Sequence, residues 1–191
     1  MENVIKEATE ANIGPNTGDW HSNCSVVTGW LLRRLGHLKV IEIGTSYGNQ
    51  LPKFLPYCSQ LIAVDPMYNW VPNVQPVEGF EPERVDQAKI DSWRKNAEPW
   101  KEKAELIIGS SYLVHKDPEA RVKLAGANIL IIDGCHHPAD SVAMDYENFR
   151  QFMAGPHYVI WDDMNLSDVR AAADRFGGDF TESFNTRICF M

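Results

Sequence analysis

Acidic side chains and a histidine follow two apolar runs in the second half of the chain. The run 128–132 leads into Asp133 and then His136, and the next apolar run leads directly into Asp162 and Asp163. Carboxylates that converge repel one another unless protons or a cation neutralise them. Oxygen ligands favour Mg²⁺, and an imidazole with an ordinary pKa of about 6.5 can take a proton from an activated hydroxyl. These residue types are compatible with a metal site at which a histidine takes the proton of a bound hydroxyl; the alternative is that Asp163 caps a turn and Asp162 only faces solvent.

A second group of polar and glycine residues follows the first two apolar runs. Glu42, Gly44 and Gly48 have the spacing E-x-G-x-x-x-G, and Asp65 ends the next run. Gly44 would allow a tight turn, and Gly48 would let the following helix begin close to a ligand. Ser46 stands where a dinucleotide-binding loop has its middle glycine, and the Gly-Lys-Ser/Thr of a phosphate-binding loop is missing. Both phosphate-binding interpretations are therefore weakened.

Five short apolar runs must position these two groups. They are continuous rather than alternating, which is typical of strands covered on both faces and therefore of a parallel sheet. The runs span residues 38–43, 61–64, 105–108, 128–132 and 158–161. The helices predicted between and around them span 25–35, 49–55, 83–97, 139–153 and 167–176. This alternation predicts a doubly wound α/β fold with its ligand site at the carboxyl ends of the strands.

The tail departs from this alternation. Residues 180–184 and 187–190 are two short strand-like segments, separated by Asn185 and Thr186. This spacing predicts a hairpin with a two-residue turn. An antiparallel pair would then close an otherwise parallel sheet, which is a specific topological expectation.

The spacing of Glu42, Gly44 and Gly48, followed by Asp65, resembles class I S-adenosylmethionine-dependent methyltransferases. The resemblance implies a Rossmann-like, mostly parallel seven-stranded sheet with an antiparallel C-terminal strand pair. It also implies that S-adenosylmethionine lies against the glycine loop, which includes Thr45, and that Asp65 holds the two ribose hydroxyls. The cofactor has no phosphate, so the missing lysine agrees with this interpretation.

The second half is similar to a subgroup that contains the macrolide-sugar and cephamycin-pathway O-methyltransferases. Asp133 and His136 occupy its D-G-x-H motif, and Asp162 and Asp163 occupy its paired acid after strand five. The resemblance implies that Asp133, Asp162 and Asp163 hold Mg²⁺ and that His136 is the general base. It also places Asp133 beside the cofactor and in the catalytic group. His137 is the alternative base.

Three positions depart from the subgroup. Pro138 stands two residues after the histidine, where relatives often have a tyrosine. The acid that usually follows in the next helix is displaced by one residue, to Asp145. After the third strand a cofactor-contacting acid is common, whereas this chain has Ser110, which we assign to the region near the adenine. These departures bear on substrate identity more than on cofactor class.

Composition and charge limit the partners. The 191 residues suit one domain, and 18 Lys and Arg against 26 Asp and Glu give a net charge of −8, which disfavours binding to nucleic acid. No run approaches the roughly 20 apolar residues of a membrane span, and the first residues lack a secretory signal pattern. We therefore expect a cytoplasmic protein with no nucleic-acid or membrane partner. Four scattered cysteines predict neither a zinc site nor a disulfide framework.

We expect residues 1–24 to form an N-terminal arm or lid and residues 25–191 to form a methyltransferase domain. Residues 66–104 are then an insertion between strands two and three. Its tryptophans, among them Trp93 and Trp100, form either an aromatic wall over the substrate or the packed side of a helix. The arm is either a lid or a contact with another copy of the chain, and the second alternative would make the protein a homo-oligomer.

The expected activity is methyl transfer from S-adenosylmethionine, with Mg²⁺ assistance, to a hydroxyl of a small-molecule acceptor such as a sugar or natural-product intermediate. One alternative is an NAD-dependent oxidoreductase, which the serine at position 46 disfavours. The other is a methyltransferase-like binding module without catalytic activity.

Overall fold

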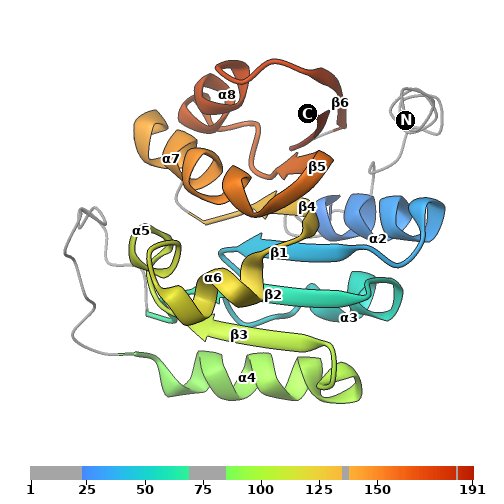
Figure 1. The fold of residues 1–191 in the computed structure, drawn as a ribbon, viewed down its shortest axis with the longest axis vertical. Coiled ribbons are helices and arrows are strands. Elements are labelled where there is room, and N and C mark those ends of the chain that lie inside the picture. Colours follow the sequence, from blue (N-terminus) through green and yellow to red (C-terminus); the bar gives the residue numbers. More distant parts are fainter. Residues whose placement is uncertain (1–22, 69–84, 135–137, 184) are drawn as a thin grey trace.

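The computed structural model describes residues 23–68, 85–134, 138–183 and 185–191. A seven-stranded sheet with the order β3-β2-β1-β4-β5-β7-β6 runs through its centre (Figure 1). The strands are β1 (Lys39–Ile43), β2 (Gln60–Asp65), β3 (Ala104–Ile108), β4 (Ala127–Ile132), β5 (Met153–Trp161), β6 (Asp179–Ser183) and β7 (Thr186–Phe190). Strands β1 to β5 are parallel, and β7 is antiparallel to both β5 and β6. The predicted doubly wound, mostly parallel sheet with an antiparallel C-terminal pair is confirmed.

Helices cover both faces of this sheet (Figure 1). They are α2 (Asn23–Leu35), α3 (Leu51–Phe54), α4 (Gln87–Ala97), α5 (Ser111–Val114), α6 (Pro118–Leu124), α7 (Ala139–Phe149) and α8 (Ser167–Asp174). On one face of the sheet, the core includes Leu31 of α2, Phe54 of α3 and Trp93 of α4. Leu124 and Phe149 belong to the core on the other face, where α5 to α8 lie.

Burial on both faces explains the continuous apolar runs. In β2, the four residues from Leu61 to Val64 are at most 1% exposed. A strand covered on both sides has no solvent face at which a polar residue would be favourable. Each large apolar side chain buried in this way contributes roughly 1.5–3 kcal/mol to folding.

Because β1 to β5 are parallel, their carboxyl ends meet at one edge of the sheet. The strand order reverses beside β1, where a ligand site is expected.

Several helix boundaries differ from the predicted ones. α2 begins at Asn23, α3 ends at Phe54 and is followed by a 3₁₀ turn, and α7 ends at Phe149, after which another 3₁₀ turn leads into β5. α4 begins at Gln87 because the carboxylate of Asp86 caps it, accepting from the backbone N–H of Ala88 at 2.9 Å. Residues 83 and 84, where this helix was predicted to begin, lie outside the described residues.

The C-terminal hairpin forms, but the turn predicted at Asn185 and Thr186 is wrong by one residue. Thr186 already pairs with Ser183 in the β6–β7 ladder, so it belongs to the strand. The short helices α5 and α6 were not predicted. Capping side chains begin both, Ser110 for α5 and Asp117 for α6.

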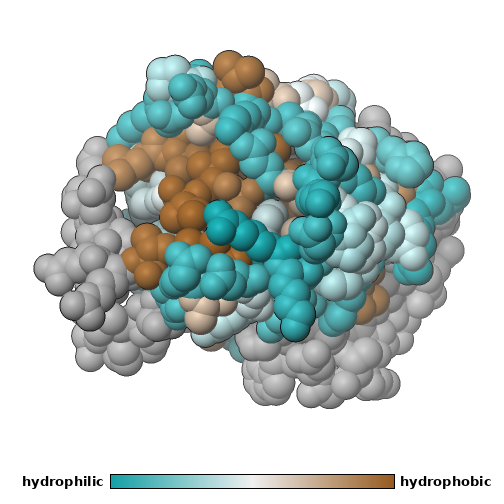
Figure 2. All heavy atoms as spheres, turned by 90° about the horizontal axis from the view of Figure 1, so that it is seen from below, coloured by the Kyte–Doolittle hydropathy of each residue, from teal (hydrophilic) through white to brown (hydrophobic). Residues whose placement is uncertain are grey.

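β3 is the edge strand at the bottom of Figure 1, and Figure 2 views the molecule from that side. Apolar and hydrophilic side chains both gather on this face (Figure 2). Ile108 at the end of β3 is 42% exposed and Val122 on α6 is 79% exposed. Lys123 and Glu105 form an ion pair of 2.5 Å at the same edge, and charged residues of this kind discourage an edge strand from pairing with another chain.

Among the described helices, none is long and apolar enough to cross a membrane.

Candidate functional site

Gly44 begins the loop after β1, in a place that leaves no room for a side chain. Its φ is +87°, and a Cβ there would lie 2.1 Å from the carbonyl oxygen of Asp133. The backbone N–H of Gly44 donates to the carbonyl of Val64 at 3.0 Å, and that of Asp133 donates to the carbonyl of Ile43 at 2.9 Å. The loops after β1, β2 and β4 are therefore tied together at one edge, as their predicted site residues require.

Asp65, at the end of β2, holds two turns in place. Its Oδ2 accepts from the backbone N–H of Ser46 at 2.8 Å, and its Oδ1 accepts from that of Met67 at 2.6 Å. Both donors have left-handed backbones, with φ of +48° for Ser46 and +56° for Met67, a conformation that is strained for residues with a side chain. Each carboxylate oxygen can accept more than one hydrogen bond, so Asp65 keeps capacity for a ligand hydroxyl.

Glu42, the second-to-last residue of β1, is a buried carboxylate that is 4% exposed. Burial raises its pKa to about 8; a hydrogen bond with the Thr45 side chain opposes the rise, and the nearby Asp133 and Asp65 charges add to it. Within the described part of the chain, no group donates to Oε2 of Glu42. A buried oxygen of this kind calls for a partner, which a water or a ligand that brings a donor can supply.

Thr45 and Gly48 lie against α4, which belongs to the predicted insertion. The indole Nε1 of Trp93 donates to Oγ1 of Thr45 at 3.0 Å, and both residues are buried. A Cβ at Gly48 would lie 2.8 Å from Cδ1 of Trp93. Trp93 therefore packs on the loop after β1, and Gly48 must be small for a reason that the sequence analysis missed. The predicted contact of Gly48 with a cofactor stays a prediction.

Asp162, at the end of β5, is also buried, at 4% exposure. Burial raises its pKa well above the ordinary range, and the charges of Asp133 and Asp163 raise it further. Oγ1 of Thr186 donates to Oδ1 of Asp162 at 3.1 Å. The three predicted metal ligands therefore lie within electrostatic reach of one another, and Asp163 has a φ of +54°.

The fit to a metal ion is nevertheless not shown. Among the residues that the structure describes, no group of three or more His, Cys, Asp or Glu side chains is arranged to hold one. The predicted base His136, its alternative His137 and the neighbouring Cys135 lie outside the described residues. Their roles stay predictions.

Cys24, in the first turn of α2, lies close to the acidic residues of the site and was not singled out from the sequence. Burial raises the pKa of its thiol, and Asp162, Asp133 and Glu42 raise it further. A neutral, buried thiol of this kind is a poor nucleophile. The N-terminal end of α2 therefore lies within electrostatic reach of the acidic group.

Ser110 and Ser111 follow β3 and have different partners. Oγ of Ser110 accepts from the backbone N–H of Tyr112 at 3.3 Å and so caps α5. Oγ of Ser111 donates to Oδ1 of Asp145 at 2.6 Å, which ties α5 to α7. Asp145 is 1% exposed, and a Cβ at Gly134 would lie 3.6 Å from its Oδ2. The assignment of Ser110 to the adenine region stays a prediction.

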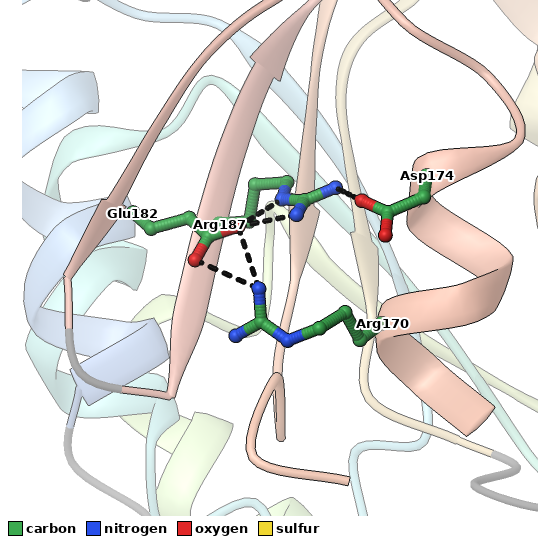
Figure 3. Close-up of polar contacts among 4 residues, drawn as sticks. All are labelled: Arg170, Asp174, Glu182 and Arg187. Atoms are coloured by element: carbon green, nitrogen blue, oxygen red, sulfur yellow. Dashed lines mark hydrogen bonds and ion pairs between the residues drawn. The ribbon is translucent and has the colours of Figure 1, made fainter. Parts of the chain in front are cut away.

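Arg187, on β7, is the centre of an ion-pair network that the sequence analysis missed (Figure 3). It is 4% exposed and bonds to Asp174 on α8 at 2.6 Å and, through Nε, to Glu182 on β6 at 2.6 Å. Arg170 on α8 also bonds to Glu182, at 3.1 Å. In the ladder Arg187 lies opposite Trp161, one residue before Asp162. The network fixes β7 and α8 beside the acidic edge.

No protein-family model and no curated protein matches this sequence. Solved structures do resemble it. A candidate caffeoyl-CoA O-methyltransferase from Staphylococcus aureus has a TM-score of 0.63 at 13% identity, over 99% of this chain and 91% of its own. The O-methyltransferase from Bacillus cereus in complex with S-adenosylhomocysteine has a TM-score of 0.61 at 11% identity, over 98% and 88%. The N-methyltransferase NodS from Bradyrhizobium japonicum, also in complex with S-adenosylhomocysteine, has 0.54 at 11%, over 95% and 94%. At these identities the likeness establishes the fold, and this chain therefore has the Rossmann-like fold of these methyltransferases.

Proposed function

We propose that this protein is an S-adenosylmethionine-dependent methyltransferase that acts on a hydroxyl of a small-molecule acceptor. The single observation that carries the proposal is the buried Oε2 of Glu42, to which no described group donates, beside a loop that must have glycine at position 44. The solved structures that share the fold support the same cofactor class, because two of them hold S-adenosylhomocysteine.

The residues at the carboxyl edge suit this cofactor. A buried carboxylate without a donor, as in Glu42, favours a ligand ammonium, and Asp65 has lone pairs left for a pair of ribose hydroxyls. Gly44 keeps the backbone open where any side chain would collide with the loop after β4. None of these features calls for a phosphate, which agrees with the missing lysine of a phosphate-binding loop.

When bound, S-adenosylmethionine supplies a methyl group that is attached to a positively charged sulfur; this sulfur is the leaving group, and it needs no acid to assist it. The protein then has two tasks, which are to orient the acceptor in line and to remove the hydroxyl proton. His136 is the residue we assign to the second task, by its place in the D-G-x-H motif. A sugar or natural-product-like acceptor is proposed on the same resemblance.

Magnesium assistance is a separate proposal that rests on the sequence, and no step above depends on it. Its support is the mutual effect of Asp133, Asp162 and Asp163, because a cation would relieve the charge that raises the pKa of Asp162. Exhaustive chelation, followed by an activity assay with and without added Mg²⁺, tests it. Activity that survives chelation unchanged would remove the metal from the mechanism.

Methyl transfer itself is tested with S-adenosylmethionine carrying a labelled methyl group and a panel of hydroxylated sugars and phenols. We expect the label on an acceptor oxygen and a sharp loss of turnover in His136→Ala. Binding of the cofactor without transfer to any acceptor would instead favour a non-catalytic binding module. Binding of NADH in place of S-adenosylhomocysteine would favour an oxidoreductase.

A further inference from the structure

Helix α4 donates hydrogen bonds to residues of the loop after β1 from the side chains of Trp93, Ser92 and Asn96. Trp93 donates from Nε1 to Oγ1 of Thr45 at 3.0 Å. Ser92 and Asn96 both donate to the backbone carbonyl of Tyr47, each at 3.1 Å. One face of α4 is therefore committed to the glycine loop, in addition to packing on the sheet.

The hydrogen bond between Trp93 and Thr45 has one possible direction. An indole N–H can only donate, so the hydroxyl oxygen of Thr45 accepts from Trp93 and its own proton is left for another acceptor. The Thr45 side chain also acts on the buried Glu42 carboxylate, because it lowers the pKa of that group against the effect of burial. Oε2 of Glu42, to which no described group donates, therefore lies near the loop that Trp93 contacts.

The loop needs such support because its backbone is strained. Ser46 has a left-handed backbone, with φ of +48°, which is strained for a residue with a side chain; Gly44 and Gly48 adopt positive φ, at +87° and +69°, without that cost. Asp65 holds Ser46 from the side of β2, and Trp93 approaches within 2.8 Å of a Cβ built on Gly48. Strained loops of this kind persist only when neighbouring groups fix them.

We propose that Trp93 is a positioning residue for cofactor binding: its hydrogen bond to Thr45 fixes the glycine loop beside Glu42, and α4 holds that loop in its binding form. This inference rests on the proposed function and adds to it a role for the insertion. Trp93 packs α4 into the core, which is one of the two roles considered for the tryptophans of the insertion, and we assign it the contact with the cofactor loop in addition.

A double-mutant cycle on the affinity for S-adenosylhomocysteine, measured by calorimetry, tests the inference. Trp93→Phe keeps the ring and removes the donor, and Thr45→Val removes the hydroxyl. We expect Trp93→Phe to weaken binding by about three- to tenfold, the worth of one hydrogen bond, and to have no further effect in the Thr45→Val background. Trp100→Phe, a matched change in the 3₁₀ turn that follows α4, should leave the affinity unchanged.

Hydrogen exchange of the ligand-free protein is the second measurement. The amides of Ser46 and Gly48 should exchange about tenfold faster in Trp93→Phe than in the wild type or Trp100→Phe. Unchanged affinity and exchange in Trp93→Phe would overturn the inference, and so would an equal loss of affinity in both Thr45 backgrounds. If the wild type bound no S-adenosylhomocysteine, the proposed function would fail while the exchange rates still decided the role of Trp93. Should Trp93→Phe not fold, the exchange test uses the double variant Ser92→Ala with Asn96→Ala.

Discussion

Thr186 and Asp162 are joined by a buried hydrogen bond of 3.1 Å between β7 and the end of β5. The bond links the antiparallel C-terminal pair to the acidic edge of the site. Arg187, the next residue along β7, points into the ion-pair network with α8 and β6 (Figure 3). The C-terminal hairpin is therefore part of the structure that supports the site.

Replacing Thr186 by Val should destabilise the protein. The substitution keeps the volume and removes the donor, so Oδ1 of the buried Asp162 loses a partner at a cost of about 1–2 kcal/mol. Urea unfolding followed by circular dichroism measures the change. Equal free energies of unfolding for Thr186→Val and the wild type would contradict the prediction.

Arg187→Met should cost about 1–3 kcal/mol, chiefly because Glu182, whose side chain is 26% exposed, loses one of its two arginines, whereas the 58% exposed Asp174 is solvated by water. Arg175→Met is the matched control, since Arg175 pairs with Asp140 at the surface, where side-chain exposures are 45% and 80%. Surface pairs contribute roughly 0–1 kcal/mol. If the two variants unfolded at the same urea concentration, the proposed importance of the network would be wrong.

Glycine 44 should not tolerate a side chain. Gly44→Ala places a Cβ 2.1 Å from a backbone oxygen, and we expect a loss of more than about 3 kcal/mol or no folded protein. Gly36→Ala is the control, because Gly36 has a similar φ of +92° but no atom within 4 Å of a built Cβ. Its cost should be only the conformational strain, about 1 kcal/mol. Similar thermal stability of the two variants would show that the close approach at position 44 is not needed.

The stability of the ligand-free protein should fall as the pH rises from about 5 to about 8. Glu42 has a pKa of about 8 in the folded protein, above its ordinary value of 4.5, so the folded state binds a proton that the unfolded state releases. This contribution is fully present below pH 4.5 and is lost as the pH passes 8. Glu42→Gln, which cannot ionise, should show a flatter profile and be more stable than the wild type at pH 8 by up to about 4 kcal/mol, because the pKa of Glu42 moves from 4.5 to about 8 on folding and each pKa unit is worth roughly 1.4 kcal/mol. An equally steep profile in the variant would assign the dependence to another group.

Much of this fold could be predicted from the sequence. The apolar runs around Ile41, Ile62 and Leu130 are continuous because helices cover both faces of the sheet, and this pattern marks parallel strands. The place of Gly44 and Asp65 at the carboxyl edge could be predicted because they end such runs, and their contact with a cofactor stays a prediction. The short helices α5 and α6 escaped because four and seven residues give too little periodicity to recognise.

The partners of the site residues could not be predicted. Trp93 and Thr45 are 48 residues apart, and Ser111 and Asp145 are 34 apart, so only the folded chain brings them together. Arg187 lies in a strand segment whose spacing gives no sign that it pairs with Asp174 on α8 and Glu182 on β6. The hairpin turn was misplaced because Asn185 and Thr186 both suit turns, whereas the ladder already includes Thr186.

Calorimetric titration with S-adenosylhomocysteine is the most direct test of the central claim, that the carboxyl edge of this sheet binds S-adenosylmethionine. We predict saturable binding to the wild type below millimolar ligand, with affinity reduced about tenfold or more in Glu42→Gln, because that variant loses a charge-assisted bond to the ligand ammonium. No binding heat at millimolar ligand, or equal affinity of the wild type and Glu42→Gln, would contradict the account.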